Sequence, residues 1–531
     1  MLSTRMLTSS RSLVGTGRAG LRTVGVALGA SLLAMPLVFY GPVVAILATV
    51  GVVAAAIALA SPVAGVSIMF FLGSIGDLQH FQGGYSLAKV LILLLLVGLL
   101  AKLVVGRMPI RRAGLMPQVV LFLLVFVVVS VRGLGSGVHT RDAITVLGYP
   151  AAFLLTLNLL RSERSIQWTL GALVTGATIA SLAAVLERYA GFSLLTALRG
   201  QQPVLDGSGV PGLQRMAGLM HDPNAAAYPC ILVIPVLIAS ASSAKRLSAK
   251  LCLFILAALS GLGLALTLSR SGYLAAVCGV LCLVLYLPYK QKVRILAVAG
   301  AALALILLFV PSHMLTARFE IIPTEVGGVS DRSIYYLTAL KLVRESPLLG
   351  VGDATFMSSM EQVVGVKQGP HSNVLSVVVD SGLVGLASLL WLVWSYVVFV
   401  HRGIFRMAGT PLKTYAIGAY AGLIGFQVQG LFISNMGWFL IWAMAAVPLC
   451  CVLVHREGTN AVYGRSALRR GEDDVEMRSK TLLHRWGMDG PWPRVLPRAA
   501  PIYSIERVSA GNPGSDCPGV SVGGGRGASK G

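Results

Sequence analysis

Charged residues are scarce in this chain of 531 residues, where Asp, Glu, Lys and Arg together make up only 12% of the sequence. A typical soluble protein carries about 25% charged residues. Hydrophobic residues, by contrast, make up 55% of the chain. A water-soluble fold of this size would have too little polar surface to face the solvent. The composition therefore excludes a soluble multidomain protein and favours one that lies in a membrane.

Acidic residues are the scarcer of the two charge types, with 21 Asp and Glu against 43 Lys and Arg and a net charge of +22. In a soluble chain, such an excess would indicate a nucleic-acid partner. In a membrane protein, basic residues gather in cytoplasmic loops under the positive-inside rule, which explains the excess more simply. We therefore expect membrane lipids, and no nucleic acid, around this chain.

Cysteine is too sparse to form a disulfide framework. Six of the seven cysteines lie in apolar stretches, and Cys517 lies in a polar C-terminal segment. The sequence has no CxxC pair and no Cys/His cluster with the spacing of a zinc site. We expect neither a metal nor a cofactor.

Long apolar runs are what the chain has in abundance, mostly near the roughly 17–25 residues that cross a bilayer as a helix. Fourteen runs fall near 23–39, 43–60, 63–76, 87–105, 115–131, 143–160, 166–186, 225–243, 251–268, 272–289, 294–310, 374–400, 414–433 and 437–454. The third is short enough to be re-entrant. The sequence thus predicts an all-α, polytopic integral membrane protein with about 12–14 transmembrane helices.

Basic residues alternate between the connections of these runs and predict the orientation. With the N-terminus inside, the short inner loops contain Arg107, Arg111, Arg112, Arg161, Arg164, Lys245, Arg246, Lys250, Lys290, Lys292, Arg294, Arg402, Arg406 and Lys413. The rule predicts a cytoplasmic segment at 1–22, a transmembrane domain at 23–454 and a cytoplasmic tail at 455–531. The N-terminal segment has no convincing cleavage site, which favours a retained first helix. The tail has little apolar periodicity, so we expect it to be disordered.

Two long connections lie on the predicted outer side, at about 187–224 and about 311–372. Long outer segments are where such proteins build sites on an outward-facing cavity. In the second connection, residues 332–345 have the spacing of an amphipathic helix that could lie in the membrane interface. The apolar positions of this helix are Ile334, Leu337, Leu340 and Val343.

Several cations remain on the predicted outer side, where the positive-inside rule disfavours them. They are Arg132, Arg141, Arg188, Arg199, Arg215, Arg270, Arg318, Arg332, Lys341, Arg344 and Lys367. A guanidinium binds phosphate through paired hydrogen bonds, so this set indicates an anionic ligand, although each residue alone also fits a solvated loop charge or a headgroup contact. Arg270 stands apart because only Ser269 and Ser271 separate it from apolar runs, where a charge is costly. It fits either a snorkelling arginine or a phosphate ligand at a helix break, and Arg215 is a second candidate.

Two histidines lie beside helix starts on this side. Asp222-Pro223-Asn224 is typical of a turn and cap, and His221 precedes it without a visible partner. His371 opens the run at 374–400, where a histidine at the water boundary can act as a general base near neutral pH. The alternative is that His371 merely caps the helix together with Ser372 and Asn373.

Four segments together resemble the O-antigen ligase and O-antigen polymerase superfamily of bacterial envelope glycosyltransferases. They are RMAGLMHDPNAAAYP, LSRSGYLA, DRSIYYLTALKLVRESPLLGVGDATF and HSNVLSVVVDSGLVGL, in the order of the family. The resemblance covers roughly 205–450, and the long outer loop precedes the helix with the histidine, as in the family. One departure is that Ser372 separates His371 from Asn373, where many members have an adjacent His-Asn pair.

The resemblance implies transfer of a glycan from an undecaprenyl-pyrophosphate carrier to a hydroxyl acceptor at the outer face of the bacterial cytoplasmic membrane. It implies that Arg215 and Arg270 bind the pyrophosphate, with Arg332 as a weaker candidate, and that His371 is the base. Neither a metal nor a nucleotide sugar takes part in such ligases. The acceptor would be a glycan or a lipid-linked molecule, and polysaccharide-assembly proteins are expected partners.

Three alternatives stay open at this stage. Ligase and polymerase differ only in the acceptor, and the four segments do not separate them. A lipid-linked oligosaccharide flippase or another polysaccharide transporter is the rival from a different class, but it should place charges at the bilayer midplane and often has repeated halves. A non-enzymatic scaffold, with the tail as its partner-binding element, is the third.

Overall fold

A computed structural model of the chain describes residues 42–79, 86–106, 108–111, 113–133, 140–199, 215–309, 329–365, 369–407 and 409–460. All of them belong to the first of two compact units, Met1–Val462. The predicted segment 1–22, the first apolar run and the tail beyond Asn460 lie outside the described residues. So does most of the first half of the second long loop, 310–328.

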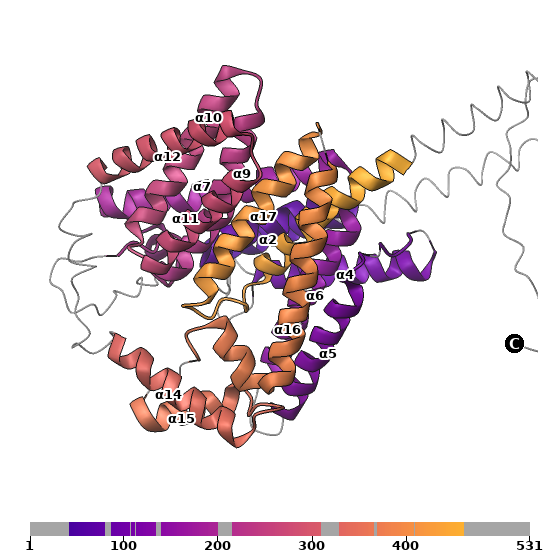
Figure 1. Ribbon diagram of the computed structural model, residues 1–531, viewed down its shortest axis with the longest axis vertical. Coiled ribbons are helices and arrows are strands. Elements are labelled where there is room, and N and C mark those ends of the chain that lie inside the picture. Colours follow the sequence, from indigo (N-terminus) through magenta and orange to yellow (C-terminus); the bar gives the residue numbers. More distant parts are fainter. Residues whose placement is uncertain are drawn as a thin grey trace, which may run out of the picture. The chain divides into compact units, whose positions relative to one another are not determined.

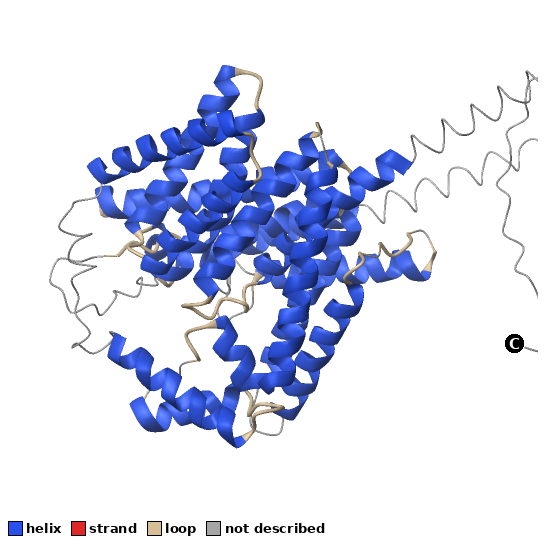
Figure 2. Cartoon of the chain, viewed as in Figure 1, coloured by secondary structure: helices blue, strands red, loops and turns tan. Residues whose placement is uncertain are grey.

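The regular structure of the described residues is helical (Figure 2). The first helices are α2 (Pro42–Ala60), α3 (Pro62–Ser74), the short 3-10 helix η1 (Gly76–Gln79), α4 (Leu87–Val104), α5 (Met116–Gly133), α6 (Thr140–Leu159), α7 (Glu163–Ala190) and α8 (Leu194–Arg199). They are followed by α9 (Pro223–Ser243), α10 (Leu247–Leu266), α11 (Arg270–Leu285), α12 (Tyr289–Phe309), α14 (Val329–Glu345), α15 (Asp353–Val364), α16 (Asn373–Arg406), α17 (Pro411–Gly430) and the 439–460 helix (Phe439–Asn460). Each apolar run predicted from residue 43 onward lies on one of these helices.

Among the residues that the structure describes, six helices are long and apolar enough to cross a membrane. They are α4, α7, α9, α10, α16 and the 439–460 helix. The prediction of an all-helical, multi-pass membrane protein is therefore confirmed. The 439–460 helix continues beyond residue 454, where the tail was predicted to begin.

Helix α9 lies at the centre of the described bundle, in contact with α7, α10, α11 and α17 (Figure 1). It starts at Asp222, whose carboxylate caps the helix by accepting a hydrogen bond from the Asn224 N–H, and Pro223 occupies the first helical position. The predicted turn and cap are thus confirmed. Most side chains of α9 are buried, as befits a helix that is apolar on all sides.

Small residues let α17 approach its neighbours closely. A Cβ atom on Gly422 would lie 2.6 Å from the Leu232 carbonyl oxygen of α9, and one on Gly425 would lie 2.5 Å from the Ala275 carbonyl oxygen of α11. No side chain fits at these distances. Close approach of backbones through small residues is the usual basis of helix packing inside a membrane, where burial of apolar surface provides little driving force.

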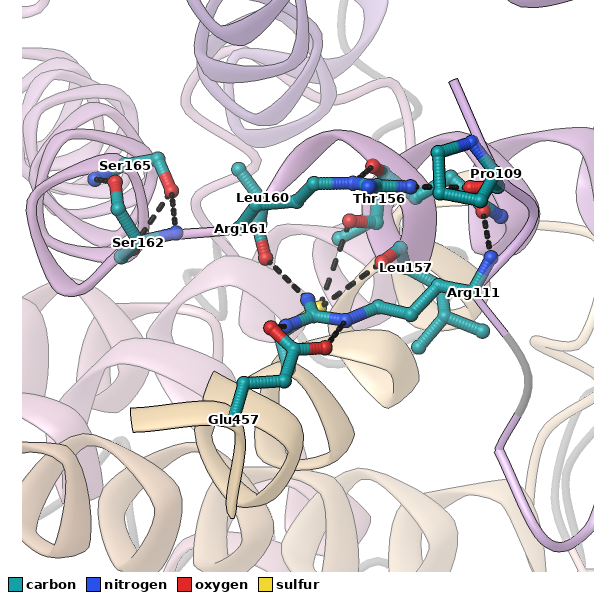
Figure 3. A network of polar contacts seen from close by, with 11 residues as sticks. Pro109, Arg111, Thr156, Leu157, Leu160, Arg161, Ser162, Ser165 and Glu457 are labelled. Atoms are coloured by element: carbon teal, nitrogen blue, oxygen red, sulfur yellow. Dashed lines mark hydrogen bonds and ion pairs between the residues drawn. The ribbon is translucent and has the colours of Figure 1, made fainter. Parts of the chain in front are cut away.

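Segments that were predicted to share the inner side of the membrane meet in the structure (Figure 3). The Arg111 guanidinium donates to both carboxylate oxygens of Glu457, at 2.9 and 2.5 Å, and to the Leu160 carbonyl oxygen at 2.8 Å. The Arg161 guanidinium donates to the Pro109 carbonyl oxygen at 2.6 Å. The α4–α5 connection, the α6–α7 connection and the end of the 439–460 helix therefore form one network.

The predicted helix at 332–345 is α14, and one side of it packs against α15. Tyr335, Ala339 and Leu342 are buried against Phe356 and Met360 of α15. Two of the predicted apolar positions, Leu337 and Leu340, face away from this contact and are 66% and 48% exposed. Helix α15, which has no long apolar run in the sequence, covers the side of α14 that carries Tyr335, Ala339 and Leu342. Placement of α14 in the membrane interface stays a prediction.

Helix α16 is broken at Gly382, whose φ of 62° and ψ of −158° are not helical. The turn that joins α14 to α15 packs into the break, where the Val351 N–H donates to the Val379 carbonyl oxygen at 2.8 Å. The Leu383 N–H donates to the Pro347 carbonyl oxygen, also at 2.8 Å. Helices α14 and α15 are thereby attached to one end of α16, which also packs along α5 (Figure 1).

Candidate functional site

The loop at 215–222, which leads into α9, is held by two carboxylates from distant parts of the chain. Glu187 of α7 accepts hydrogen bonds from the Ala217 and Gly218 N–H groups at 3.1 and 2.8 Å. Asp77 of η1 accepts one from the His221 N–H at 2.5 Å. The loop therefore has a defined conformation, because the N–H groups of Ala217, Gly218 and His221 all donate to carboxylates.

Arg215 is the first described residue of this loop and is only 6% exposed. Its Nε atom donates to the Thr267 carbonyl oxygen at 2.9 Å, and one terminal nitrogen donates to Asn224 Oδ1 at 2.8 Å. The Met216 N–H also donates to the Leu266 carbonyl oxygen, at 3.0 Å. Arg215 thus connects the loop to the end of α10 and to the first turn of α9.

Residues 267–269 interrupt the helix between α10 and α11, as predicted from the polar break in the apolar run. Leu268 has a φ of 50°, which residues other than glycine rarely adopt. Ser269 caps α11 by accepting a hydrogen bond from the Gly272 N–H, and its hydroxyl donates to Asn224 Oδ1 at 3.0 Å. Strained backbone of this kind persists only where surrounding contacts hold it, and it is often found at functional sites.

Arg270 is the first residue of α11 and its side chain is exposed. A helix N-terminus carries partial positive charge and unpaired N–H groups, which attract anions. The guanidinium of Arg270 adds a full positive charge at this position. The structure thus brings the two predicted pyrophosphate ligands to one helix break, because Arg215 and Ser269, the neighbour of Arg270, both donate to the side chain of Asn224.

His371 lies immediately before α16, and Ser372, not His371, caps that helix by accepting from the Leu375 N–H. The His371 ring packs edge-on against Tyr335 of α14, with ring centroids 4.7 Å apart. The capping alternative that the sequence left open therefore applies to Ser372. His371 is positioned between α14 and the start of α16 and is half-buried.

Asn373 fixes the start of α16 to the connection between α17 and the 439–460 helix. Its Oδ1 accepts from the Asn435 and Met436 N–H groups at 2.8 and 3.2 Å, and its Nδ2 donates to Asn435 Oδ1 at 2.6 Å. Both asparagines are buried. The second residue after His371 thus has a clear positioning role.

The end of α17 joins the His371 side of the site to the Arg215 side. Gln429 donates from Nε2 to the Asn224 carbonyl oxygen at 3.2 Å. The next residue, Gly430, lies so close to Asn373 that a Cβ atom would be 2.1 Å from the Asn373 amide nitrogen. Segments that are far apart in the sequence, and that were predicted to lie on the outer side, therefore converge around residues 429–436.

The remaining sequence candidates are less well placed. Arg332 lies in the first turn of α14, and its side chain is outside the described ones. Arg132, Arg141 and Arg199 lie on helices, but their side chains too are outside the described ones. Arg318 and Lys367 lie outside the described residues altogether. Over the residues that the structure describes, no group of three His, Cys, Asp or Glu side chains could hold a metal ion.

An apolar cavity of about 140 Å³ opens between α5, α6, α16, α17 and the 439–460 helix. Its lining includes Leu123, Phe153, Tyr396 and Trp442. Met436, whose N–H donates to Asn373, also lines the cavity. One end of the cavity therefore lies close to the start of α16.

Sequence reasoning missed four residues that hold this site together, namely Asp77, Glu187, Gln429 and Asn435. An acidic or amide side chain near the end of an apolar run was the only signal available for each. Such a signal is weak, because polar residues at helix ends usually just face water or headgroups.

Comparison with known proteins identifies part of the chain. No curated protein sequence matches it. Residues 255–390 match the family model described as O-Antigen ligase. This range contains three of the four segments that carry the resemblance, from the break before α11 to the helix that follows His371. Residues 255–390 of this multi-pass membrane protein therefore match the O-antigen ligase family.

Proposed function

We propose that the chain is a membrane glycosyltransferase that moves a glycan from an undecaprenyl-pyrophosphate carrier to a hydroxyl acceptor at the outer face of the membrane. The family match at 255–390 implies a glycan transferase of the ligase or polymerase type. The observation that carries the proposal is the exposed guanidinium of Arg270 at the N-terminus of α11, with the Arg215 charge beside the same helix break.

The proposed reaction transfers the glycan from phosphate to the acceptor oxygen. The acceptor hydroxyl attacks the anomeric carbon of the glycan, and the bond between that carbon and the pyrophosphate oxygen breaks. The acceptor proton passes to His371, and undecaprenyl pyrophosphate leaves with the electron pair of the broken bond. Negative charge therefore grows on the pyrophosphate as the reaction proceeds, and fixed positive groups stabilise it best when they are already in place.

The two arginines have different parts in this proposal. Arg270 is exposed and contacts the pyrophosphate at the N-terminus of α11, where the helix carries partial positive charge. Arg215 is buried, and two of its nitrogen atoms already bind protein oxygens. We therefore assign Arg215 mainly to positioning of the break, with its charge adding to the positive field around the leaving group.

His371 acts in the proposal as the general base that accepts the proton of the acceptor hydroxyl. This role is supported by the position of His371 between Tyr335 and the start of α16. Ser372 caps the helix, so His371 is not needed for that purpose. The contacts of residues 429–436 with both Asn224 and Asn373 support a common site for His371 and the arginines. The apolar cavity beside Met436 offers a place for part of an isoprenoid chain.

The experiment is deletion of the gene in the bacterium that carries it, followed by complementation with Arg270→Ala, Arg215→Ala and His371→Ala. We expect the deletion to abolish the surface polysaccharide and to accumulate its lipid-linked precursor on the outer face of the membrane. The three variants should behave like the deletion, although each protein is present in the membrane at the normal level. Arg344→Ala, which removes an exposed cation from α14, serves as the matched control and should complement fully.

The lipid-linked pool separates this proposal from its rivals. Accumulation on the inner face would overturn transfer in favour of transport across the membrane. Full complementation by all three variants would overturn the site. If the deletion leaves single glycan units attached to the acceptor, the enzyme is a polymerase, whereas loss of attachment itself identifies a ligase.

A further inference from the structure

A cavity of about 340 Å³ lies at the end of α16 opposite to His371, between this helix and the 439–460 helix. Three arginines line it, Arg402 and Arg406 from the last turns of α16 and Arg456 from the 439–460 helix. Trp394 and Val398, earlier on α16, form its apolar wall. Positive charge is thus gathered at one end of the cavity and apolar surface at the other.

The spacing along α16 places these side chains on one stripe of the helix. Arg402 and Arg406 are four residues apart, and Val398 precedes Arg402 by the same interval, so all three lie on neighbouring turns of one face. From Trp394 to Arg406 the helix rises about 18 Å. This length is several times that of a phosphate group. It is long enough for a lipid headgroup together with the first part of an acyl chain.

The three guanidinium groups have no carboxylate partner among the residues that the structure describes. Glu457 is next to Arg456 in sequence, but Arg111 binds both of its carboxylate oxygens. Arg456 lies over the Phe399 ring, with 5.1 Å between its central carbon and the ring centroid, and this contact orients its guanidinium. An anion between these arginines would therefore meet positive charge that the protein itself does not neutralise.

Trp394 distinguishes a lipid from a soluble anion as the occupant. Its side chain is 70% exposed, on a helix that is apolar enough to cross a membrane. Because Trp394 precedes Arg406 by about 18 Å along the helix, it lies at the depth of the acyl chains when the arginines lie at the level of the headgroups. A soluble anion would use the arginines alone, whereas a phospholipid uses the arginines and the apolar wall together.

We propose that the cavity between α16 and the 439–460 helix binds one anionic phospholipid, with its phosphate held by Arg402, Arg406 and Arg456 and an acyl chain along Val398 and Trp394. Basic pockets between membrane helices bind anionic headgroups on the cytoplasmic side, and that is the side predicted for this end of α16. The inference does not depend on the transfer reaction. It assigns a structural lipid to the opposite end of the molecule.

The test uses the purified full-length protein in a neutral detergent, with cardiolipin, phosphatidylglycerol or phosphatidylcholine added stepwise. Lipid binding is counted by native mass spectrometry and followed by the thermal midpoint, because a ligand that binds only the folded state raises it. We expect the two anionic lipids to bind and stabilise the protein, and phosphatidylcholine to do neither. The combined variant Arg402→Gln, Arg406→Gln and Arg456→Gln should bind cardiolipin about tenfold more weakly or worse.

A matched control removes the same charge elsewhere on the predicted cytoplasmic side, through Lys245→Gln, Arg246→Gln and Lys250→Gln at the connection of α9 and α10. Cardiolipin binding should be unchanged in this control. Equal loss in both combined variants would show unspecific attraction and overturn the proposal. Inorganic phosphate that stabilises the wild type as strongly as cardiolipin, and no longer does so in the combined variant, would also overturn it, in favour of a soluble anion. If the combined variant fails to fold, Arg402→Gln alone replaces it, since Arg402 is exposed, and unchanged cardiolipin binding there would overturn the proposal.

Discussion

The guanidinium of Arg215 donates a 2.8 Å hydrogen bond to Oδ1 of Asn224, nine residues later in the chain. The same oxygen accepts a hydrogen bond from the Ser269 hydroxyl at 3.0 Å. One amide oxygen therefore ties the 215–222 loop, the first turn of α9 and the break before α11 to one another. The position of Arg270 depends on this oxygen, because Arg270 directly follows Ser269.

Replacement of Asn224 tests that dependence. Asn224→Leu removes the shared acceptor and leaves a buried arginine with one hydrogen-bond partner fewer, which we expect to cost about 2 kcal/mol of unfolding free energy. Glycan transfer should fall at least as strongly as in Arg270→Ala. Asn224→Asp retains the acceptor oxygen and should retain most of the stability. The measurements are the thermal midpoint in detergent and surface polysaccharide after complementation, and equal behaviour of the Leu and Asp variants would contradict the shared role.

Gly382 provides a test of the break in α16. It has a φ of 62°, and a Cβ atom there would lie 2.4 Å from the backbone of Leu348. Gly382→Ala should therefore displace the turn at 347–352 and lower the unfolding free energy by more than about 2 kcal/mol. Gly171→Ala in α7 is the control, since nothing lies within 4 Å of its Cβ position. It should be neutral or slightly stabilising. An unchanged thermal midpoint for Gly382→Ala would show that α16 can straighten.

Hydropathy alone predicted most of the helices, because each membrane crossing needs a long uninterrupted apolar run. It also predicted which connections share a side, and Arg111, Leu160 and Glu457 indeed meet. Helix α15 escaped prediction because it is short and its apolar residues Phe356 and Met360 pack only on α14 and its neighbours. The same contact explains why α14 buries Tyr335 rather than Leu337.

The site was predictable in its residue types but not in its connections. A polar break around Arg270 is visible in an apolar sequence, and so is a histidine at the start of a helix. The contact of Asp77 with the His221 N–H joins residues 144 positions apart, and no local pattern reports such a pair. For the same reason, the link from Gln429 to Asn224 could only come from the packing of α17 on α9.

Asn373 offers a test of how His371 is positioned. Its Oδ1 accepts from two backbone N–H groups of the 435–436 connection, so Asn373→Leu leaves both without that partner. We expect this variant to lower the rate of transfer by about tenfold or more through displacement of His371. Asn373→Asp keeps the acceptors and loses only the donor to Asn435, so its loss should be smaller. The ratio of the two rates is measured with purified protein and the lipid-linked donor, and a ratio of one would contradict the positioning role.

The ion pair of Arg111 and Glu457 should respond unequally to removal of its two partners. The Arg111 side chain is 6% exposed, whereas that of Glu457 is 56% exposed. Glu457→Ala therefore leaves a buried, uncompensated charge, at a cost of about 2 kcal/mol of unfolding free energy. Arg111→Met leaves a carboxylate that water can solvate and should cost about 1 kcal/mol. The double variant should resemble Arg111→Met, because the buried charge is then absent. Thermal unfolding of the three variants measures these differences. A larger loss of stability for Arg111→Met than for Glu457→Ala would contradict the prediction. It would show that the hydrogen bond from Arg111 to Leu160 matters more than the ion pair with Glu457.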